Sequence, residues 1–318
     1  RSGMNPKEQL DAIFAAAAPL YKERDKTYSE IKKLLNPYGV CGLSIKELEQ
    51  QEKCEIWQVV LDEQVSETLL SKKETFEDMK KMYSVMKQTV AEYDKDAVSS
   101  GKMAGGAGEL LKKYNEKHDK NLLGDFLSSA VEYAVKTAES NACMKRIVAA
   151  PTAGSCGIIP GVLIAYENIF GTDEDKLIKA LFTASGIGNV IAQNASISGA
   201  QGGCQAEIGT ASAMASGALA YLEGGSNDCI ANAAALALKN MLGLVCDPVA
   251  GLVEVPCIKR NAAGATNAAV AAQMALSGIK SVIPIDEVID SMYSIGCSIP
   301  TCLRETSQAG LAITPTAI

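Results

Sequence analysis

The 318-residue sequence contains one histidine and one tryptophan, and aromatic residues make up 5% of it. The histidine, His118, lies in the charged run 116–120, which is typical of a solvated helix face rather than of a catalytic base. Alternating runs of Val, Ile or Thr are scarce, which argues against a β-rich fold. No two cysteines have the Cys-x-x-Cys spacing that structural zinc sites prefer. The chain therefore lacks the usual signals of a histidine-based centre, a zinc ribbon and a β-sheet protein.

The composition describes a globular chain with a net charge of −7 and 47% hydrophobic residues. The negative charge argues against binding to nucleic acid. No charged segment followed by an apolar one opens the chain, so we expect a cytoplasmic protein whose cysteines stay reduced. Residues 147–166 carry no charge, but prolines and glycines interrupt them. They predict a buried loop leading into a helix, and no membrane partner is expected.

Charged residues divide the chain unevenly. Of its 30 Lys and Arg and 37 Asp and Glu residues, 47 lie in residues 1–146 and 20 in the longer stretch 147–318. We therefore predict an N-terminal helical region over 1–98 and a catalytic, site-bearing region over 99–318, joined in one continuous domain.

Helix signals run through both regions. A capped amphipathic helix is expected near 5–17, and a further helical stretch runs from Ser44 to about 97. Segments 206–222, 227–242 and 265–279 are rich in Ala, Gly, Ser and Asn, whose small side chains allow close packing. The fold class predicted is mainly α, a compact multi-helix domain in which glycine-rich loops form the functional site.

Three of the ten cysteines, Cys204, Cys246 and Cys257, lie in two segments that contain Gly and Pro and few charged residues. Thiolates are the ligands that iron–sulfur clusters and zinc select, and three of them leave one metal position open for chemistry. Free cysteine is also a common buried residue, so spacing alone leaves both interpretations open. For the cysteines in helical surroundings we expect core packing: Cys41, Cys54, Cys143 and Cys229.

Glycine-rich loops at 99–108, 150–157 and 194–201 expose backbone N–H groups that suit a carboxylate or a phosphate. Taken singly, each loop is more typical of a tight turn, and only the set of loops together favours a binding site. The substrate-binding candidates in these loops are Gly105, Gly106, Thr152, Gly154, Asn194 and Gln201. The catalytic candidates are Lys102, Ser155 and Ser198.

Three long motifs carry a resemblance to a known family: residues 146–157, residues 202–209, and residues 246–261 with their Cys-Asp-Pro-Val-Ala-Gly and Pro-Cys-Ile-Lys-Arg-Asn segments. They resemble the alpha chain of bacterial iron–sulfur-dependent L-serine dehydratase. The resemblance runs from about Gly101 to Thr306. Motifs with several Gly, Pro and Cys residues at fixed spacing are far more specific than a short glycine motif.

The resemblance implies a four-iron, four-sulfur cluster held by Cys204, Cys246 and Cys257, with one iron open to substrate. That iron would act as a Lewis acid in the conversion of L-serine to pyruvate and ammonia. Neighbouring acids would orient the ligands; these are Glu207, Asp247 and Glu254. Cys156 suits a substrate-loop wall, whereas the roles of Cys297 and Cys302 stay open.

The catalytic base is not evident, since no candidate side chain has a suitable pKa without strong perturbation. In this family alpha and beta parts occur fused or as separate chains, and the beta part is missing from this sequence. We therefore expect a beta chain to complete the site in a hetero-oligomer.

Other functions remain possible on the sequence. An L-cysteine desulfidase or a threonine dehydratase would use the same scaffold and chemistry. Lys102 beside Gly105 and Gly106 also resembles a pyridoxal-phosphate lysine with a phosphate loop, although the enzymes of that kind resemble α/β folds. A non-catalytic assembly subunit would use the cysteines only for packing.

Overall fold

The structure, a computed structural model, describes residues 55–68, 70–118 and 121–318. Within these residues all regular secondary structure is helical, and the only backbone bridge is an isolated parallel one between Cys246 and Arg304. The predicted mainly α-helical fold is confirmed. The longer helices are α3 (Ile56–Thr68), α4 (Lys72–Ala91), α5 (Ala107–Lys117), α6 (Gly124–Ala142), α7 (Ile158–Phe170), α8 (Glu174–Asn194), α10 (Thr210–Leu222), α11 (Asn227–Lys239), α12 (Cys257–Leu276) and α13 (Ile285–Ser298).

All described residues belong to one compact unit, Ser44–Ile318. The helix predicted at 5–17 lies outside the described residues, as does the start of the stretch from Ser44. The rest of that stretch forms α3 and α4, and α4 begins with a capping box in which the Ser71 and Glu74 side chains each accept the other's backbone N–H. A domain boundary at residue 98 stays a prediction.

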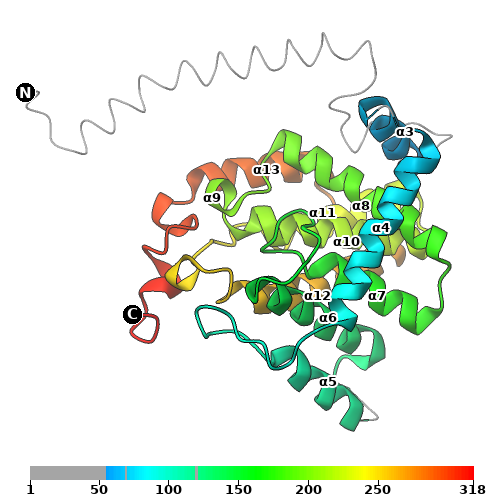
Figure 1. Cartoon of the computed structure of the whole chain (residues 1–318). Coiled ribbons are helices and arrows are strands. Elements are labelled where there is room, and N and C mark those ends of the chain that lie inside the picture. Colours follow the sequence, from blue (N-terminus) through cyan, green and yellow to red (C-terminus); the bar gives the residue numbers. More distant parts are fainter. Residues whose placement is uncertain (1–54, 69, 119–120) are drawn as a thin grey trace, which may run out of the picture. The chain divides into compact units, whose positions relative to one another are not determined.

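Helix α10 forms the centre of this unit, where α7, α8, α11 and α12 all contact it (Figure 1). All of its residues except Tyr221 are buried, which is typical of a helix surrounded by others. Its small residues let the neighbours approach, and its two serine hydroxyls donate across the interfaces: Ser212 to the Gly264 carbonyl at 2.9 Å, and Ser216 to the Ala233 carbonyl at 3.0 Å.

Helices α6 and α7 pack closely because α7 carries a glycine at the contact. A Cβ added at Gly161 would lie 2.7 Å from the Ala130 carbonyl oxygen and 2.9 Å from the Ala134 Cβ, which is too near for either atom. Neighbouring Gly157 has the same constraint against the Ala134 carbonyl. This contact fixes the loop before α7 against α6, and that loop carries the predicted residues Thr152 and Ser155.

Two helix boundaries differ from the sequence prediction. Helix α12 begins at Cys257 rather than at residue 265, because Ile, Lys, Arg and Ala after Pro256 all favour helix. Cys257 therefore lies in the first turn of a helix and not in a loop. The helix predicted over 227–242 ends at Lys239. The predicted loop before α7 is present, since α7 begins at Ile158, but only its last residues, 154–157, are buried, and Ala149 and Ala153 are exposed.

Replacement of Gly161 by Ala tests the α6–α7 contact. Overpacking costs about 1–3 kcal/mol, whereas Ala in a helix gains about 1 kcal/mol over Gly. We expect the free energy of unfolding, measured by urea denaturation, to fall by about 1 kcal/mol or more because the clash dominates. Ala263→Leu, at an exposed position of α12, is the matched control and should change stability little. A more stable Gly161→Ala variant would contradict the packing described.

Candidate functional site

Two of the three predicted ligand cysteines meet beside an acidic side chain. The Sγ atoms of Cys204 and Cys246 and a carboxylate oxygen of Glu207 all lie within 4.8 Å of one another. Cys204 directly precedes the π-helical turn Gln205–Gly209, which leads into α10. Both sulfurs are almost fully buried. The arrangement brings together two segments that are about 40 positions apart in the sequence.

The C-terminal segment holds Cys246 in place through its backbone. The N–H of Cys246 donates to the Leu303 carbonyl at 2.9 Å, and the N–H of Glu305 donates to the Cys246 carbonyl at 2.7 Å. Glu305 adopts a positive φ of 63° to do so, a conformation that few residues other than glycine take. The Glu305 side chain thereby reaches the cysteine region.

Gly199 forms one wall of this region. A Cβ at Gly199 would lie 3.0 Å from the Cys246 Sγ, 2.9 Å from the Glu207 Oε2 and 3.3 Å from the Glu305 Oε2. The three side chains therefore converge on the space above the Gly199 backbone. Only glycine leaves that space open.

Cys257 lies nearby but outside the group of atoms within 4.8 Å of one another. Burial, together with the charges of Cys204 and Glu207, raises its pKa to about 12. The Cys246 thiol hydrogen-bonds to the Cys204 sulfur, which lowers the pKa of Cys204 and raises that of Cys246. All three predicted ligands therefore belong to one electrostatically coupled region.

Arg260 contacts this region from the first turn of α12. Its Nη1 donates to the Cys204 Sγ at 3.1 Å and to the Val245 carbonyl at 2.8 Å, and its Nη2 donates to Asp247 at 3.1 Å. The Asp247 carboxylate also accepts the Leu311 N–H at 2.8 Å. This positive charge contributes to the lowered pKa of Cys204, after the hydrogen bond from Cys246.

The loop before α7 reaches Glu207 through a chain of hydroxyl groups. The Thr152 hydroxyl donates to the Glu207 carboxylate at 2.7 Å and lies 3.1 Å from the Ser155 hydroxyl. Because a hydroxyl carries one hydrogen, Ser155 is the donor to Thr152. Burial raises the pKa of Glu207, the Thr152 hydrogen bond opposes this, and the Glu305 charge adds to the increase. Two predicted loop residues thus form a hydrogen-bonded chain that ends at Glu207, beside the cysteines.

Asn261 joins the same loop to α12. Its amide donates to the Gly154 carbonyl at 2.8 Å and to the Cys257 carbonyl at 2.9 Å, and its oxygen accepts the Gly157 N–H at 2.9 Å. The side chain is fully buried. Gly154 also lies close to Glu207, since a Cβ there would lie 3.1 Å from the carboxylate. The predicted residues Thr152, Gly154 and Ser155 therefore border the cysteine region.

The glycine-rich loop 99–108 is folded around two carboxylates of the chain itself. Glu254 accepts hydrogen bonds from the Ser99 hydroxyl at 2.6 Å, the Gly101 N–H at 3.1 Å and the Met103 N–H at 3.2 Å. Glu139 accepts the N–H groups of Gly105, Ala107 and Gly108. The cradle predicted at Gly105 thus holds an internal carboxylate at the N-terminus of α5.

The remaining predicted residues lie at the edges of the site. Ser198 and Gln201 flank Gly199, and Gln201 accepts a hydrogen bond from Ser196 at 2.8 Å. The Asn194 amide donates to the Val190 carbonyl at 2.8 Å. Lys102 is exposed and has a positive φ of 58°. Roles in catalysis or substrate binding stay predictions for Thr152, Gly154 and Ser155, and equally for the six predicted residues outside the 150–157 loop: Lys102, Gly105, Gly106, Asn194, Ser198 and Gln201.

Among the described residues, cysteines other than the three predicted ligands do not belong to the group around Cys204 and Cys246. Cys156 is fully buried, Cys297 is exposed, and both Cys143 and Cys229 are half-buried. Cys41 and Cys54 lie outside the described residues. The histidine at the end of α5 is exposed and its Nδ1 lies 2.8 Å from the Tyr114 carbonyl, as expected of a solvated helix end.

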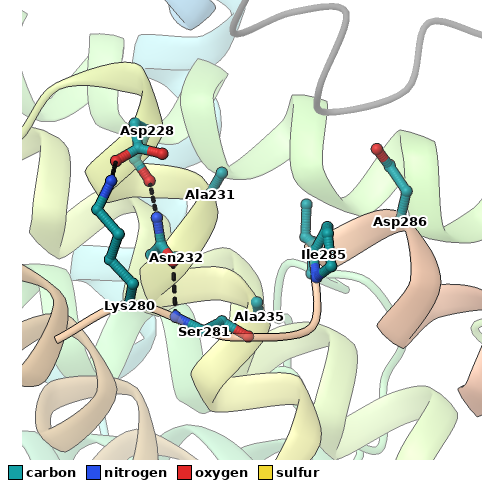
Figure 2. Close-up of a pocket in the computed structure, with 9 residues that line it drawn as sticks. Asp228, Ala231, Asn232, Ala235, Lys280, Ser281, Ile285 and Asp286 are labelled. Carbon is teal, nitrogen blue, oxygen red and sulfur yellow. Dashed lines mark hydrogen bonds and ion pairs between the residues drawn. The ribbon is translucent and has the colours of Figure 1, made fainter.

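A separate pocket of about 200 Å³ lies between α11 and the segment before α13 (Figure 2). Asp228 and Lys280 form an ion pair of 3.1 Å there, and the Ser281 N–H donates to the Asn232 side chain at 2.7 Å. None of the residues lining it is a predicted site residue. Asp228, Asn232, Lys280 and Ser281 bond to one another there, so these groups give no indication of chemistry.

Sequence reasoning did not assign functions to Arg260, Asn261 or Glu305. One signal was available for two of them: Arg260 and Asn261 follow Cys257 by three and four positions, which places all three on one face of a helix. It was missed because the helix was predicted to begin eight residues later. The approach of Glu305 depends on a bridge to Cys246, and local sequence carries no signal of it.

An all-helical unit with buried thiols converging beside a carboxylate defines a candidate thiolate metal protein. Residues 51–312 match the family described as "Serine dehydratase alpha chain". The chain is 49% identical to the probable L-serine dehydratase alpha chain of Bacillus subtilis over 270 residues, covering 85% of this chain and 90% of that one. It is 41% identical to the L-serine dehydratase alpha chain of Peptoniphilus asaccharolyticus, covering 81% and 88%.

A third relative is longer. The L-serine dehydratase TdcG of Escherichia coli is 47% identical over 183 residues, which cover 57% of this chain and 40% of that protein. The chain belongs to the serine dehydratase alpha chain family, and the family predicted from its motifs is confirmed. None of the described helices has the length and apolar composition needed to cross a bilayer.

Glu254→Gln tests how the 99–108 loop is held. The amide cannot accept all three hydrogen bonds, so buried donors are left unpaired at a cost of about 1–3 kcal/mol. We expect trypsin to cleave the variant faster after Lys102. The cleavage rate is measured by mass spectrometry of the fragments. Glu109→Gln, on α5, is the control for loss of one acidic charge. Equal cleavage rates in the two variants would show that Glu254 does not hold the loop.

Proposed function

We propose that this chain is the alpha subunit of an L-serine dehydratase, a carbon–oxygen lyase that converts L-serine to pyruvate and ammonia. Family membership over most of the chain supports this activity, since its alpha-chain relatives carry that name. The observation that carries the proposal is the convergence of Cys204, Cys246 and Glu207 within 4.8 Å, inside the motifs of the family.

We further propose a [4Fe–4S] cluster held by Cys204, Cys246 and Cys257. The donor set fits such a group, because thiolates are the ligands of iron–sulfur clusters and three of them leave one iron without a cysteine. The space that only glycine leaves open at position 199 also fits, since two of the surrounding groups are a sulfur and the Glu207 carboxylate. When bound, the cluster supplies a Lewis acid for the β-hydroxyl of serine.

The reaction removes the α-proton and the β-hydroxyl of serine together as water. The product, 2-aminoacrylate, tautomerises to an imine, which takes up one water to give pyruvate and ammonia. The protein must therefore hold the substrate carboxylate, accept one proton from the α-carbon and exclude water from the reacting atoms. The burial of all three cysteines serves the last requirement.

Two loops that border the cysteines are proposed to bind the substrate. In the loop before α7, Thr152, Gly154 and Ser155 carry the binding and catalytic roles, because their groups lead to Glu207. At the start of α9 (Gly199–Gly202), Ser198 precedes Gly199 and Gln201 lies two positions after it, and Asn194 lies further upstream at the end of α8. In the 99–108 loop, exposed Lys102 remains the catalytic candidate and Gly106 a substrate-binding candidate, whereas the Gly105 N–H donates to Glu139 and so does not bind substrate.

A beta chain is proposed as the partner that completes the site. The chain matches only 40% of the length of the E. coli relative, whose remaining length has no counterpart in the match. The single histidine is exposed at the end of α5, so among the described residues no histidine adjoins the cysteines as a base. The complex would work in the reducing cytoplasm, in keeping with the free state of all eight described cysteines.

Single Cys→Ser replacements at 204, 246 and 257 test the cluster. Each should reduce iron retention after anaerobic reconstitution by at least about tenfold, since even residues that only support metal ligands contribute about 10–100-fold. Conversion of serine to pyruvate should be lost with the iron. The control is Cys229→Ser, a half-buried thiol on α11, which should keep both properties. Full iron content in the three variants would refute the ligand set.

Dependence on a beta chain is tested by assaying the alpha chain alone and co-purified with the beta chain. We expect pyruvate formation from serine only in the complex, because the alpha chain lacks an evident base. Threonine and cysteine in the same assay report substrate preference. Full activity of the alpha chain alone would contradict the proposed partner.

A further inference from the structure

Arg260 contacts all three cysteine segments at once. It lies one helical turn after Cys257, on the same face of α12. Its guanidinium reaches the Cys204 sulfur directly, and it reaches the Cys246 segment through the flanking Val245 carbonyl and Asp247 carboxylate.

These contacts use most of the hydrogen-bond donors of the Arg260 guanidinium. Nη1 donates both of its hydrogens, one to sulfur and one to a carbonyl, while Nη2 forms the ion pair with Asp247. The Arg260 side chain is 17% exposed and that of Asp247 is 5% exposed, so the pair is largely shielded from solvent. A planar fork of donors is required for this geometry, and the single ammonium of lysine does not provide it.

We propose that Arg260 is a positioning residue that fixes the three cysteine segments relative to one another and donates a hydrogen bond to the Cys204 sulfur of the cluster. The inference rests on the proposed function, because it takes the three cysteines as cluster ligands. A donor and a positive charge beside the sulfur stabilise the more negative, reduced cluster and thus raise its reduction potential.

The test compares Arg260→Gln, Arg260→Lys and the control Lys259→Gln, which removes a neighbouring exposed charge from the same helix. Each protein is reconstituted anaerobically as the alpha–beta complex, and iron and sulfide per chain are measured together with the cluster's midpoint potential. We expect Arg260→Gln to retain iron about 10–100-fold more weakly and to shift the potential of any remaining cluster downward. Arg260→Lys keeps the charge and should show a smaller downward shift, with iron retention still weakened.

The outcomes separate the two proposals. If the unaltered protein binds no cluster, the proposed cofactor is wrong. If it does, and Arg260→Gln matches Lys259→Gln in iron content and potential, the role of Arg260 is wrong. If Arg260→Gln does not fold, as judged by circular dichroism, the lysine variant decides: weakened iron retention in a folded protein supports the proposal, and unchanged retention and potential overturn it.

Discussion

The site depends on placing several acidic groups, thiols and carboxylates, close together where water is scarce. Cys204, Cys246 and Glu207 lie within 4.8 Å of one another, and Glu305 faces the same space. Burying such charges without compensation is costly, so each must be neutralised, hydrogen-bonded or bound to a cation. Arg260 supplies one positive charge in direct contact, while Thr152 and the Cys246 thiol supply hydrogen bonds. The remaining excess of negative charge is what a bound cationic metal centre would offset.

Small residues and internal polar contacts hold the helices and loops around the site in place. Gly161 lets α7 approach α6, and the serines of α10 donate to carbonyls of neighbouring helices instead of remaining unpaired. Buried carboxylates hold loops in the same way: Glu139 accepts the N–H groups at the start of α5, and Glu254 accepts those of the preceding loop. Glycine-rich backbone, which is costly to order, is thereby fixed by charge-assisted hydrogen bonds.

The sequence predicted the helical fold and the segments that form the site, because both are local properties. Helix-forming composition, glycine and proline punctuation, and the motifs around Cys204 and Cys246 are all readable without tertiary structure. The role of the 99–108 glycines was harder to predict. An anion cradle was expected there, and the anion that the structure shows at Gly105 comes from Glu139 of the chain itself. Neither the parallel bridge from Cys246 to Arg304 nor the approach of Glu305 leaves a local signal.

The low number of charged residues in the second part of the chain helps to identify site residues that helical periodicity does not reveal. Only 20 charged residues occur after position 146, and the two arginines among them, Arg260 and Arg304, both lie beside cysteine segments. A charge retained in an otherwise apolar region must find a partner there, and in this fold the available partners are sulfur, carboxylate and backbone carbonyl groups. Glu254 extends the argument to the glycine-rich loop: it lies three residues before Cys257 and holds Ser99, Gly101 and Met103. Movement of the 99–103 loop is therefore coupled physically to the start of α12, where one of the proposed ligands resides.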